Sequence, residues 1–508
     1  MTVPERINVE VQVDFALDQQ EEFPKTENAT RLFDTAQTSY RRTRVEHWNE
    51  VARKFASKTG WGGYYHTRLK EMYGSLIAPG QSVLELGCGR GDLVAALKPS
   101  LGVGVDFSAE MIRQGRKKYP NIRFIHGDVH ELDLSDKFDV IILSDLINDL
   151  WDVQSVLTNV VRLTTPRSRI IINWYSHLWE PLIKLAEQLE LAKPNLYQNW
   201  LAPEDVAGLL YLADCEVIKQ SAEVLLPLPV PLLAGFANRF LVKLWPFRFF
   251  ALTNFVIARP QPRGDYCART PSVSVIVPAR NEAGNIPDIV SRTPEMGDGT
   301  ELVFVEGHSR DNTYAVIEAT IAANPGRRCQ LLRQTGVGKG DAVRMGFGHA
   351  NGGMLMILDA DLTVPPEDLP LFYEALRSGK GEFINGVRLV YPMEKQAMRF
   401  LNLVGNKFFS LAFSWLLGQS IKDTLCGTKV LRKKDYEAIA ANRSYFGDFD
   451  PFGDFDLIFG AVKLNLKLAD LPIRYRERTY GTTNINRWSH GWLLLRMLVF
   501  AAKRLKFV

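Results

Sequence analysis

Two blocks of the chain show the same alternation of short apolar runs and longer amphipathic stretches. The first block extends from Ser82 to about Pro260, and its apolar runs read SVLELG, VGVGVDF, VIILSDL, RIIINWY and NFVIAR. The second block begins at Ser272, and its runs read SVSVIVP, ELVFVE and MLMILDAD. Stretches with helical periodicity, such as residues 109–119, separate these runs. Because short strands that alternate with helices are typical of parallel sheets with crossover helices, we expect two α/β domains.

The segments around the two blocks complete the organisation. Residues 1–40 are polar, rich in acids and without sustained periodicity, which favours a loosely ordered leader. The first domain is expected over residues 41–260 and the second over residues 272–485. The linker 261–271 between them is rich in proline, arginine and small polar residues. A basic amphipathic helix is expected over residues 486–508.

Two stretches of the second half are strongly apolar yet carry regularly placed polar residues. In residues 397–418 the polar side chains recur at steps of three or four, which predicts one narrow polar stripe on a helix. Such a stripe suits a helix lying in the lipid interface, or a core helix with a solvent edge, rather than a spanning helix. With the similar stretch 488–507, the pattern favours peripheral contact with a membrane. The stripe consists of Arg399, Asn402, Asn406, Ser410 and Ser414.

The net charge says little about binding partners, but the distribution of charged residues along the chain says more. Across 508 residues, 61 basic and 57 acidic side chains leave a formal charge of +4, and we expect no nucleic-acid partner. From Arg474 onward the only acid is Glu477, which suits phosphate groups, an anionic lipid surface or a solvated face. The basic residues of this end are Arg474, Arg476, Arg478, Arg487, Arg496, Lys503, Arg504 and Lys506.

Cysteine usage and the N-terminal sequence indicate a reducing compartment. The five cysteines are scattered and form no C-x-x-C pair, so neither a disulfide framework nor a zinc site is expected. The first residues, MTVPERINVEVQVDF, have neither the basic region nor the apolar core of a signal peptide. We therefore predict a cytoplasmic protein that is peripheral on the membrane.

A glycine-rich turn follows the first predicted strand. Gly87, Gly89 and Gly91 come directly after residues 83–86, at the strand end where open α/β sheets bind ligands. Glycines there permit positive φ angles and let a ligand approach the backbone. A dinucleotide fingerprint requires glycine or alanine where this chain has Asp92, so the turn argues against a pyrophosphate ligand.

From about residue 40 to residue 260, the sequence resembles the class I S-adenosylmethionine-dependent methyltransferases, which have a Rossmann-like fold. The resemblance is carried by the glycine turn, by Asp106 at the end of the next strand and by Gly127-Asp128-Val129. It implies that the glycine loop wraps the methionine part of S-adenosylmethionine, that Asp106 binds the ribose hydroxyls and that Asp128 borders the adenine. The aromatic segments 47–48 and 61–66 resemble the lid of these enzymes. The implied S-adenosylmethionine-binding positions are Glu85, Gly87, Gly89, Gly91, Asp106, Asp128, Val129 and Ser144.

The sequence says less about the methyl acceptor than about the methyl donor. Residues 144–149 and 173–177 follow the fourth and fifth strands, so we expect them to face the acceptor. Methyl transfer is a direct displacement in which alignment contributes most of the rate, and a dedicated base is not always needed. His177 is a candidate base, with a surface or capping histidine as the alternative. For the whole domain, a non-binding relative of the family is the alternative.

Two carboxylates follow a buried strand of the second block. Asp359 and Asp361 come directly after the apolar run 354–358, and their spacing points both side chains the same way. Such a pair can hold one hard divalent cation, Mg²⁺ or Mn²⁺, which neutralises a diphosphate leaving group. The pair therefore indicates a nucleotide-sugar donor, whereas a turn or surface pair is the alternative for the tripeptide alone.

Residues 271–485 resemble the family 2 glycosyltransferases of GT-A fold, especially the branch related to dolichyl- and polyprenyl-phosphate sugar synthases. The matching motifs lie at residues 278–282, 309–313, 338–342, 359–361, 386–388, 423–427 and 478–483. The resemblance implies that Asp359 and Asp361 hold the metal and that Arg478 contacts phosphates. Because Glu306-Gly307-His308 replaces the usual Asp-Asp-Gly, the family's specificity for the nucleotide base and for the sugar cannot be carried over to this chain. The implied nucleotide-sugar-binding positions are Pro278, Arg280, Glu282, Glu306, Ser309, Asp311, Lys339, Asp341 and Arg388.

The acceptor of the sugar decides whether a base is needed. A polyprenyl phosphate, which the resemblance implies, is already anionic and needs no general base. Catalysis then rests on metal charge neutralisation by Asp359 and Asp361 and on Arg478. A hydroxyl acceptor needs a base, for which Asp423, also counted among the catalytic positions, and the Asp454/Asp456 pair are candidates.

The sequence thus predicts a bifunctional enzyme with two α/β domains, a Rossmann-like methyltransferase followed by a GT-A glycosyltransferase. Its partners are S-adenosylmethionine, a nucleotide-sugar donor and a polyprenyl-phosphate or other lipid-linked acceptor. One alternative is an active methyltransferase with a degenerate glycosyltransferase-like binding module. The other is a polysaccharide synthase, because Asn484-x-x-Arg487-Trp488 resembles the Q-x-x-R-W acceptor motif.

Overall fold

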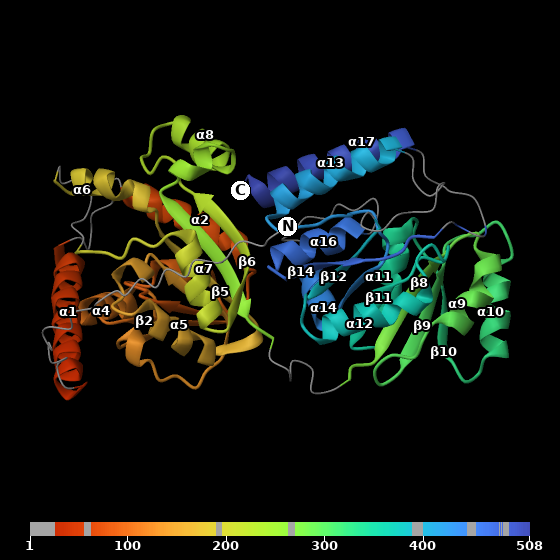
Figure 1. The fold of residues 1–508 in the computed structure, drawn as a ribbon, viewed down its shortest axis with the longest axis horizontal. Coiled ribbons are helices and arrows are strands. Elements are labelled where there is room, and N and C mark those ends of the chain that lie inside the picture. The colour runs from red at the N-terminus through yellow and green to blue at the C-terminus, as the bar shows by residue number, and fades with distance from the viewer. Residues whose placement is uncertain are drawn as a thin grey trace, which may run out of the picture.

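In the computed structural model, the chain folds into two α/β units that lie side by side (Figure 1). The structure describes residues 26–54, 62–188, 196–262, 270–388, 400–443, 454–476, 478, 480 and 487–507. Each unit is built on a seven-stranded sheet with helices packed against it. The prediction of two α/β domains is confirmed.

The first sheet has the strand order β3-β2-β1-β4-β5-β7-β6. Its first five strands are parallel neighbours, whereas β7 is antiparallel to both β5 and β6. The run NFVIAR, expected in a parallel sheet, therefore runs the other way, because the connection 224–252 leaves and re-enters the sheet at the same end. The strands are β1 (Ser82–Leu86), β2 (Leu101–Asp106), β3 (Arg123–His126), β4 (Phe138–Ser144), β5 (Thr164–Tyr175), β6 (Cys215–Glu223) and β7 (Thr253–Pro260).

The second sheet has the strand order β10-β9-β8-β11-β13-β12-β14. Here β13 is antiparallel to both of its neighbours, and the other neighbouring strands are parallel. The carboxyl ends of β8, β9 and β11 consequently meet at one edge of this sheet. The strands are β8 (Val273–Ala279), β9 (Thr300–Glu306), β10 (Arg328–Arg333), β11 (Met354–Ile357), β12 (Phe383–Val387), β13 (Lys429–Arg432) and β14 (Leu468–Pro472).

Helices cover both sheets. The first unit has α1 (Thr26–Lys54), α2 (Gly62–Leu76), α3 (Asp92–Ala96), α4 (Ala109–Lys118), η1 (Val129–Glu131), η2 (Ile147–Asp149), α5 (Val153–Arg162), η3 (His177–Trp179), α6 (Glu180–Gln188), α7 (Pro203–Leu212), α8 (Leu233–Arg239), η4 (Leu241–Lys243) and η5 (Phe247–Phe250). The second has η6 (Ala283–Asn285), α9 (Ile286–Arg292), α10 (Thr313–Ala323), α11 (Lys339–His349), η7 (Pro366–Asp368), α12 (Leu369–Arg377), α13 (Phe400–Leu417), α14 (Lys433–Ala441), α16 (Asp454–Lys463), α17 (Arg487–Ala501) and η8 (Ala502–Lys506).

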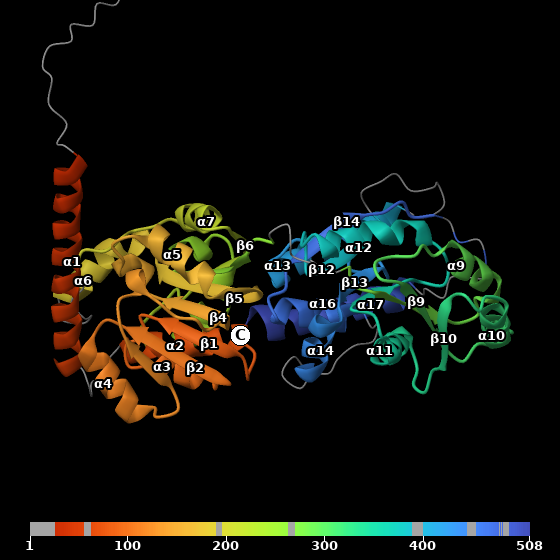
Figure 2. The same cartoon turned by 90° about the horizontal axis from the view of Figure 1, so that it is seen from below.

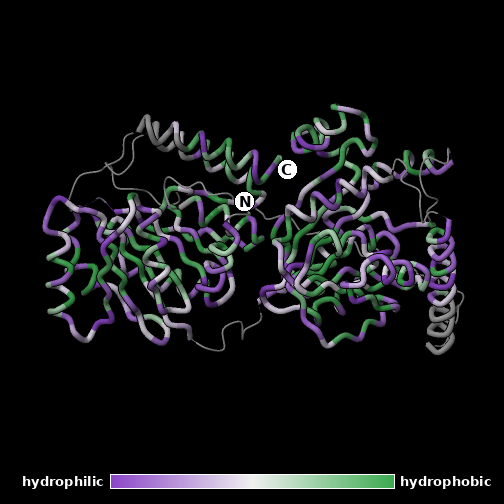
Figure 3. Tube along the Cα trace, turned by 180° about the vertical axis from the view of Figure 1, so that it is seen from behind, coloured by the Kyte–Doolittle hydropathy of each residue, from purple (hydrophilic) through white to green (hydrophobic). Residues whose placement is uncertain are grey.

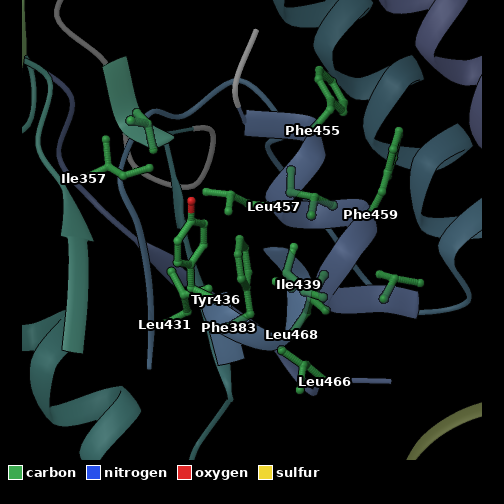
Figure 4. Close-up of a cluster of buried hydrophobic side chains, with 14 of the residues drawn as sticks. Ile357, Phe383, Leu431, Tyr436, Ile439, Phe455, Leu457, Phe459, Leu466 and Leu468 are labelled. Carbon is green, nitrogen blue, oxygen red and sulfur yellow. The ribbon is translucent and has the colours of Figure 1, made fainter. Parts of the chain in front are cut away.

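Each sheet buries aliphatic and aromatic side chains beneath its helices. In the second unit, Ile357, Phe383 and Leu431 of three neighbouring strands pack against Ile439 of α14 and Phe455 of α16 (Figure 4). Burial of such side chains contributes about 1.5–3 kcal/mol each. This packing holds the strand ends that carry the polar residues described below.

The two units contact each other through buried charges. Arg169 of β5 donates to Glu382 (2.7 Å), and Arg259 of β7 lies 3.3 Å from the same carboxylate. All three side chains are almost completely buried. Although burial alone would raise it, the two guanidinium groups hold the pKa of Glu382 below its usual value. The contact is therefore a specific, water-excluded joint.

The predicted leader differs from the structure from Thr26 onward. Residues 26–54 form one helix, α1, which packs against α4 and lies along the far edge of the first unit (Figure 2). Tyr40 Oη donates to the carbonyl of Leu150 (3.4 Å), and Arg44 Nε donates to Asp149 (2.8 Å). These tertiary bonds order a segment whose composition alone favours disorder.

Two residues of the predicted polar stripe, Ser410 and Ser414 of α13, face the protein. Both donate to the carbonyl of Ile421, and the exposed side of the helix carries Phe408, Leu411 and Trp415. The hydroxyls satisfy a buried carbonyl that would otherwise lack a partner. Arg399 and the side chains of Asn402 and Asn406 lie outside the described residues. In the described part of the chain, no helix is long and apolar enough to cross a membrane.

Candidate active sites

The glycine turn of the first unit is held in a conformation that other residues rarely adopt. Gly87, Gly89 and Gly91 have φ angles of 68°, 53° and 75°. A Cβ on Gly87 would lie 2.7 Å from Leu146, and one on Gly91 would lie 2.5 Å from Phe124. A Cβ on Gly89 would meet nothing within 4 Å. Packing therefore requires two of the glycines, whereas Gly89 borders open space that a ligand can enter.

Asp106 and Glu85 have different tasks at this turn. The Asp106 carboxylate accepts hydrogen bonds from the backbone amides of Gly89 and Ser108, both at 2.8 Å, so it lies directly against the loop. Glu85 instead accepts from the Val94 amide in the first turn of α3 (3.0 Å), and burial raises the pKa of Glu85 to about 8. Asp106 thus lies where the sequence expected ligand contact, while Glu85 supports the loop from beneath.

A pocket opens between η1, η2 and α1, next to Phe107, which follows Asp106. Asp128 accepts from both the backbone and the ring Nδ1 of His130 and lies 2.9 Å from Arg41. Asp149 accepts from Arg44 and from Trp48 Nε1 (2.7 Å), so part of the predicted lid lies against it. The lining residues are Gln37, Tyr40, Arg41, Arg44, Phe107, Asp128, Val129, His130, Asp149, Leu150 and Trp151.

The wall that α1 contributes was missed in the sequence. Residues 37, 40, 41 and 44 lie at the spacing i, i+3, i+4, i+7, which is the signature of one helix face. That spacing is the signal that could have found them across the expected boundary at residue 40 between the leader and the first domain. Of the other predicted lid residues, Trp61 lies outside the described residues.

Asp145 lies in a buried polar cluster at the end of β4. Tyr65 Oη and Asn173 Nδ2 donate to its Oδ1 at 2.9 and 2.5 Å, and Tyr175 Oη lies 3.5 Å from its Oδ2. Burial raises the pKa of Asp145 to about 7. His177, named as a candidate base with a surface histidine as the alternative, is largely exposed and lies 3.6 Å from Glu180. At this edge Asp145, rather than His177, has the surroundings of a proton acceptor.

In the second unit, Asp359 and Asp361 are each paired with a cation from another element. Asp359 Oδ1 lies 2.7 Å from Lys339 Nζ at the start of α11. Asp361 Oδ2 lies 2.6 Å from Arg478, whose other terminal nitrogen lies 3.3 Å from Glu282. Burial raises the pKa of Glu282 to about 7, whereas Lys339 outweighs burial and keeps the pKa of Asp359 below its usual value. Five predicted residues thus meet at the carboxyl ends of β8 and β11.

The motif at residues 423–427 closes one side of this cluster. A Cβ on Gly427 would lie 1.9 Å from Asp359 Oδ2, so only glycine fits beside the carboxylate. Asp423 is buried and accepts from Arg388 Nε and Nη2 at 2.7 and 2.9 Å. Although burial opposes ionisation, Arg388 holds the pKa of Asp423 below its usual value. A carboxylate held in this way is a poor base, which disfavours Asp423 among the three bases predicted for a hydroxyl acceptor. Asp456 pairs with Arg443.

The remaining predicted nucleotide-binding residues mostly shape loops. Glu306 accepts from the Ser309 amide (2.5 Å), and Ser309 Oγ accepts from the Asn281 amide (3.0 Å). Asp341 Oδ2 accepts from Gln334 and from the Gly336 amide. Asp311 likewise accepts from Thr313, while Arg280 is exposed and Pro278 half-buried at the end of β8. These contacts link three loops around the cluster.

The acidic residues of this cluster fit a divalent cation together with phosphate oxygens. Among the described residues, no group of three or more histidine, cysteine, aspartate or glutamate side chains is arranged to hold a metal ion. Mg²⁺ is commonly held by one or two carboxylates plus substrate phosphates. Asp359 and Asp361 supply such oxygens, and each already attracts one positive charge, from Lys339 and Arg478. Gly481, Thr483 and Asn484 of the predicted motifs lie outside the described residues.

Comparisons with known proteins place a different family on each unit. Residues 77–212 match the family model of a methyltransferase domain, and residues 274–440 match that of glycosyl transferase family 2. A stretch of 102 residues is 36% identical to the undecaprenyl-phosphate 4-deoxy-4-formamido-L-arabinose transferase of Shewanella sediminis and covers 19% of this chain and 31% of that protein. The glycosyltransferase AglJ of Haloferax volcanii is 28% identical over 234 residues, 46% of this chain and 72% of its own.

Among solved structures, a S-adenosylmethionine-dependent methyltransferase of Thermotoga maritima is 17% identical. The superposition covers 43% of this chain and 97% of that one, with a TM-score of 0.33. Of the Shewanella sediminis transferase named above, the chain spans less than two thirds of the length.

Proposed function

Because the chain combines a methyltransferase domain with a family 2 glycosyltransferase domain, we propose that it is a bifunctional transferase. One domain transfers a methyl group from S-adenosylmethionine. The other transfers a glycosyl group from a nucleotide sugar to a lipid-linked phosphate. The name of the Shewanella sediminis relative, an undecaprenyl-phosphate sugar transferase, supports a polyprenyl-phosphate acceptor.

The convergence of Lys339 and Arg478 on Asp359 and Asp361 carries the proposal of sugar transfer. Asp359 and Asp361 would hold Mg²⁺ or Mn²⁺, which supplies positive charge for the departing nucleoside diphosphate. Arg478 and Lys339 bring further positive charge to the phosphates. Asp423 acts as a positioning residue, because it fixes Arg388 beside the cluster. A phosphate acceptor is anionic at neutral pH and needs no base.

The open space at Gly89 and the pocket between η1, η2 and α1 support S-adenosylmethionine binding in the first domain. Asp106 would receive the ribose hydroxyls, and Asp128 and Val129 would border the adenine. Asp145 would accept the proton of a methyl acceptor such as a hydroxyl, since its raised pKa allows it to take up a proton near neutral pH. The acceptor would then approach along the ends of β4 and β5.

A paired activity assay tests the sugar transfer. Purified protein is incubated with Mn²⁺, undecaprenyl phosphate and a panel of nucleotide sugars, and lipid-linked products are identified by mass spectrometry. We expect product with the wild type and a loss of about 100-fold or more in Asp361→Asn. Asp288→Asn, which changes an exposed carboxylate outside the cluster, serves as the control. Equal rates in the wild type and Asp361→Asn would overturn the proposal.

A binding assay tests the methyl donor independently of the acceptor. Gly89→Arg places a long side chain in the open space beside Asp106 and should abolish S-adenosylmethionine binding in calorimetry. Gly80→Arg is the matched control, because Gly80 also has a positive φ angle (79°) and no atom within 4 Å of a Cβ. Unchanged affinity in Gly89→Arg contradicts the proposed site.

A further inference from the structure

The connection between β6 and β7 exposes large apolar side chains on the first domain. It contains α8, η4 and η5, and Leu232 and Trp245 are 93% and 77% exposed. A soluble monomer seldom exposes so many large apolar residues together. η3 belongs to the same surface, because Trp179 Nε1 donates to the carbonyl of Phe250 (2.9 Å). The exposed apolar residues are Leu178, Leu182, Leu185, Leu232, Leu233, Phe236, Phe240, Leu244, Trp245, Phe247, Phe249 and Phe250.

Two helices of the second domain show the same property. On α13 the exposed residues Phe408, Leu411 and Trp415 lie at the spacing i, i+3, i+7, opposite the inward serines. On α17 the exposed residues Trp492, Leu495 and Val499 repeat that spacing, while Leu494, Met497 and Ala501 are buried. Each helix therefore has an apolar outer stripe in addition to its packed inner face.

The apolar residues of both domains form one continuous surface. Arg239 Nε of α8 donates to the carbonyl of Phe507, after η8. The Phe507 ring lies 5.2 Å from that of Phe240 and 5.9 Å from that of Trp415. α6, α8, α13 and α17 lie along the same edge of the molecule (Figure 1), and hydrophobic residues follow α8 and the α13–α17 pair (Figure 3). We call this surface the apolar edge.

The segments of the apolar edge from α8 to η5, on α13 and on α17 with η8 carry only positive charges, whereas α6 also carries Glu180 and Glu187. Residues 224–252, 400–417 and 487–507 contain no aspartate or glutamate. Their basic residues surround the exposed aromatic side chains, and an anionic bilayer attracts such residues with about 1 kcal/mol each. Aromatic side chains with neighbouring lysine and arginine are the composition of an interfacial membrane surface. The exposed basic residues are Arg239, Arg248, Lys407, Arg496, Lys503 and Arg504.

We propose that the apolar edge docks both domains together onto the surface of an anionic phospholipid bilayer, with α8, η4 and η5 of the methyltransferase domain entering the headgroup region beside α13 and α17. Both transferases are thereby presented to one membrane. The docking depends on the exposed residues alone and not on either proposed activity.

Vesicle sedimentation with the full chain tests the docking. The probes are vesicles of phosphatidylcholine alone and of an equimolar mixture of phosphatidylcholine and phosphatidylglycerol. We expect binding to the anionic vesicles, weaker binding to the neutral ones and a decrease at high salt. Trp245→Ser/Phe249→Ser in the first domain and Leu411→Ser/Trp492→Ser in the second should each lower partitioning by about tenfold or more.

Leu212→Ser/Leu371→Ser is the matched control, since both residues are exposed and lie on α7 and α12, outside the apolar edge. Circular dichroism verifies that each variant is folded. Arg248→Glu provides a second variant that should weaken binding to anionic vesicles only. The proposal is overturned if Trp245→Ser/Phe249→Ser partitions onto vesicles as strongly as the wild type does. It is also overturned if the wild type binds no vesicles and instead forms dimers, measured by light scattering, that are lost in these variants.

Discussion

Asp145 and Gly427 show how single positions decide the chemistry of the two sites. The sequence placed Asp145 in a loop expected to face the methyl acceptor, but only the structure shows that Tyr65, Asn173 and the end of β4 enclose it. The resulting burial raises the pKa of Asp145 to about 7. Gly427 belongs to a motif, but the reason for glycine becomes visible only when Asp359 lies against it. Both positions owe their role to neighbours that are remote in the chain.

Replacing Asp145 should affect the rate of methyl transfer more than donor binding. We expect Asp145→Asn to lower kcat by about 100-fold, because the proton acceptor is lost. In the wild type the rate should rise with pH through about 7, the range in which Asp145 loses its proton, and the variant should lack this step. His177→Ala, which changes an exposed ring, should retain the wild-type profile. Identical pH profiles in Asp145→Asn and the wild type would exclude the role.

The same carboxyl group gives a stability prediction of defined sign. Its raised pKa means that the folded protein binds more protons than the unfolded chain between about pH 4 and pH 7. Its favourable contribution is therefore complete below about pH 4 and is lost as the pH rises through 7. The free energy of unfolding of Asp145→Asn, measured relative to that of the wild type, should therefore be higher at pH 8 than at pH 5. Chemical denaturation at both pH values measures this difference, and an opposite sign contradicts it.

Gly427→Ala should separate the two activities. The added methyl group would lie 1.9 Å from Asp359 and 2.6 Å from Lys339, so it displaces the ion pair. We expect sugar transfer to fall by about 100-fold and S-adenosylmethionine binding to stay unchanged. Gly348→Ala, where a Cβ meets nothing within 4 Å, is the control. Retention of sugar transfer by Gly427→Ala would show that the pair is not part of the site.

Among the elements, α1 changes most between the sequence and the structure. Its polar composition predicted a loosely ordered leader up to residue 40, yet Gln37 and Tyr40 belong to a helix and line the pocket together with Arg41 and Arg44. A composition argument averages over a window, whereas four residues on one helix face are enough to bind a folded domain. For α13 the sequence placed Ser410 and Ser414 on one side of the helix, but the carbonyl of Ile421 decides that this side faces inward.

Arg44→Ala tests the contribution of α1. The loss of the guanidinium leaves Asp149 without its cationic partner and opens the pocket. The dissociation constant of S-adenosylmethionine should rise by about tenfold, or roughly 1.4 kcal/mol. Arg42→Ala removes an exposed arginine from the same helix and should leave the affinity unchanged. Calorimetry measures the affinity of both variants for S-adenosylmethionine. An equal loss of affinity in both would mean that α1 acts through its overall positive charge and not through the pocket.

At the scale of the whole molecule, the two domains are joined by buried charges and share the apolar edge. Arg169, Arg259 and Glu382 are nearly inaccessible to water, so their attraction is strong only while all three are present. Segment 224–252 of the apolar edge leads directly into β7, where Thr253 Oγ1 donates to Tyr65 Oη, and Tyr65 donates to Asp145. The domains therefore form one assembly rather than two independent enzymes on a linker.

Glu382→Ala should uncouple the domains. Arg169 would remain buried without its carboxylate, and among the described residues Arg259 would keep only Glu216 as an acidic partner. Removing one partner of a buried ion pair costs about 3–5 kcal/mol. Calorimetric unfolding should then separate into two transitions, one for each domain. Glu374→Ala, at an exposed position on α12, is the control. A single transition at the wild-type temperature would show that Glu382 does not hold the joint.

The sequence by itself determined the two α/β domains, the glycine turn and the Asp359–Asp361 pair. These features are local, because strand periodicity, positive φ angles and the spacing of two carboxylates depend on adjacent residues. The tertiary structure decided the pocket wall from α1, the raised pKa of Asp145, the engagement of Asp423 by Arg388 and the outward apolar stripe of α13. Each of these depends on which remote side chain or carbonyl arrives at the site, and that information is absent from any short window of the chain.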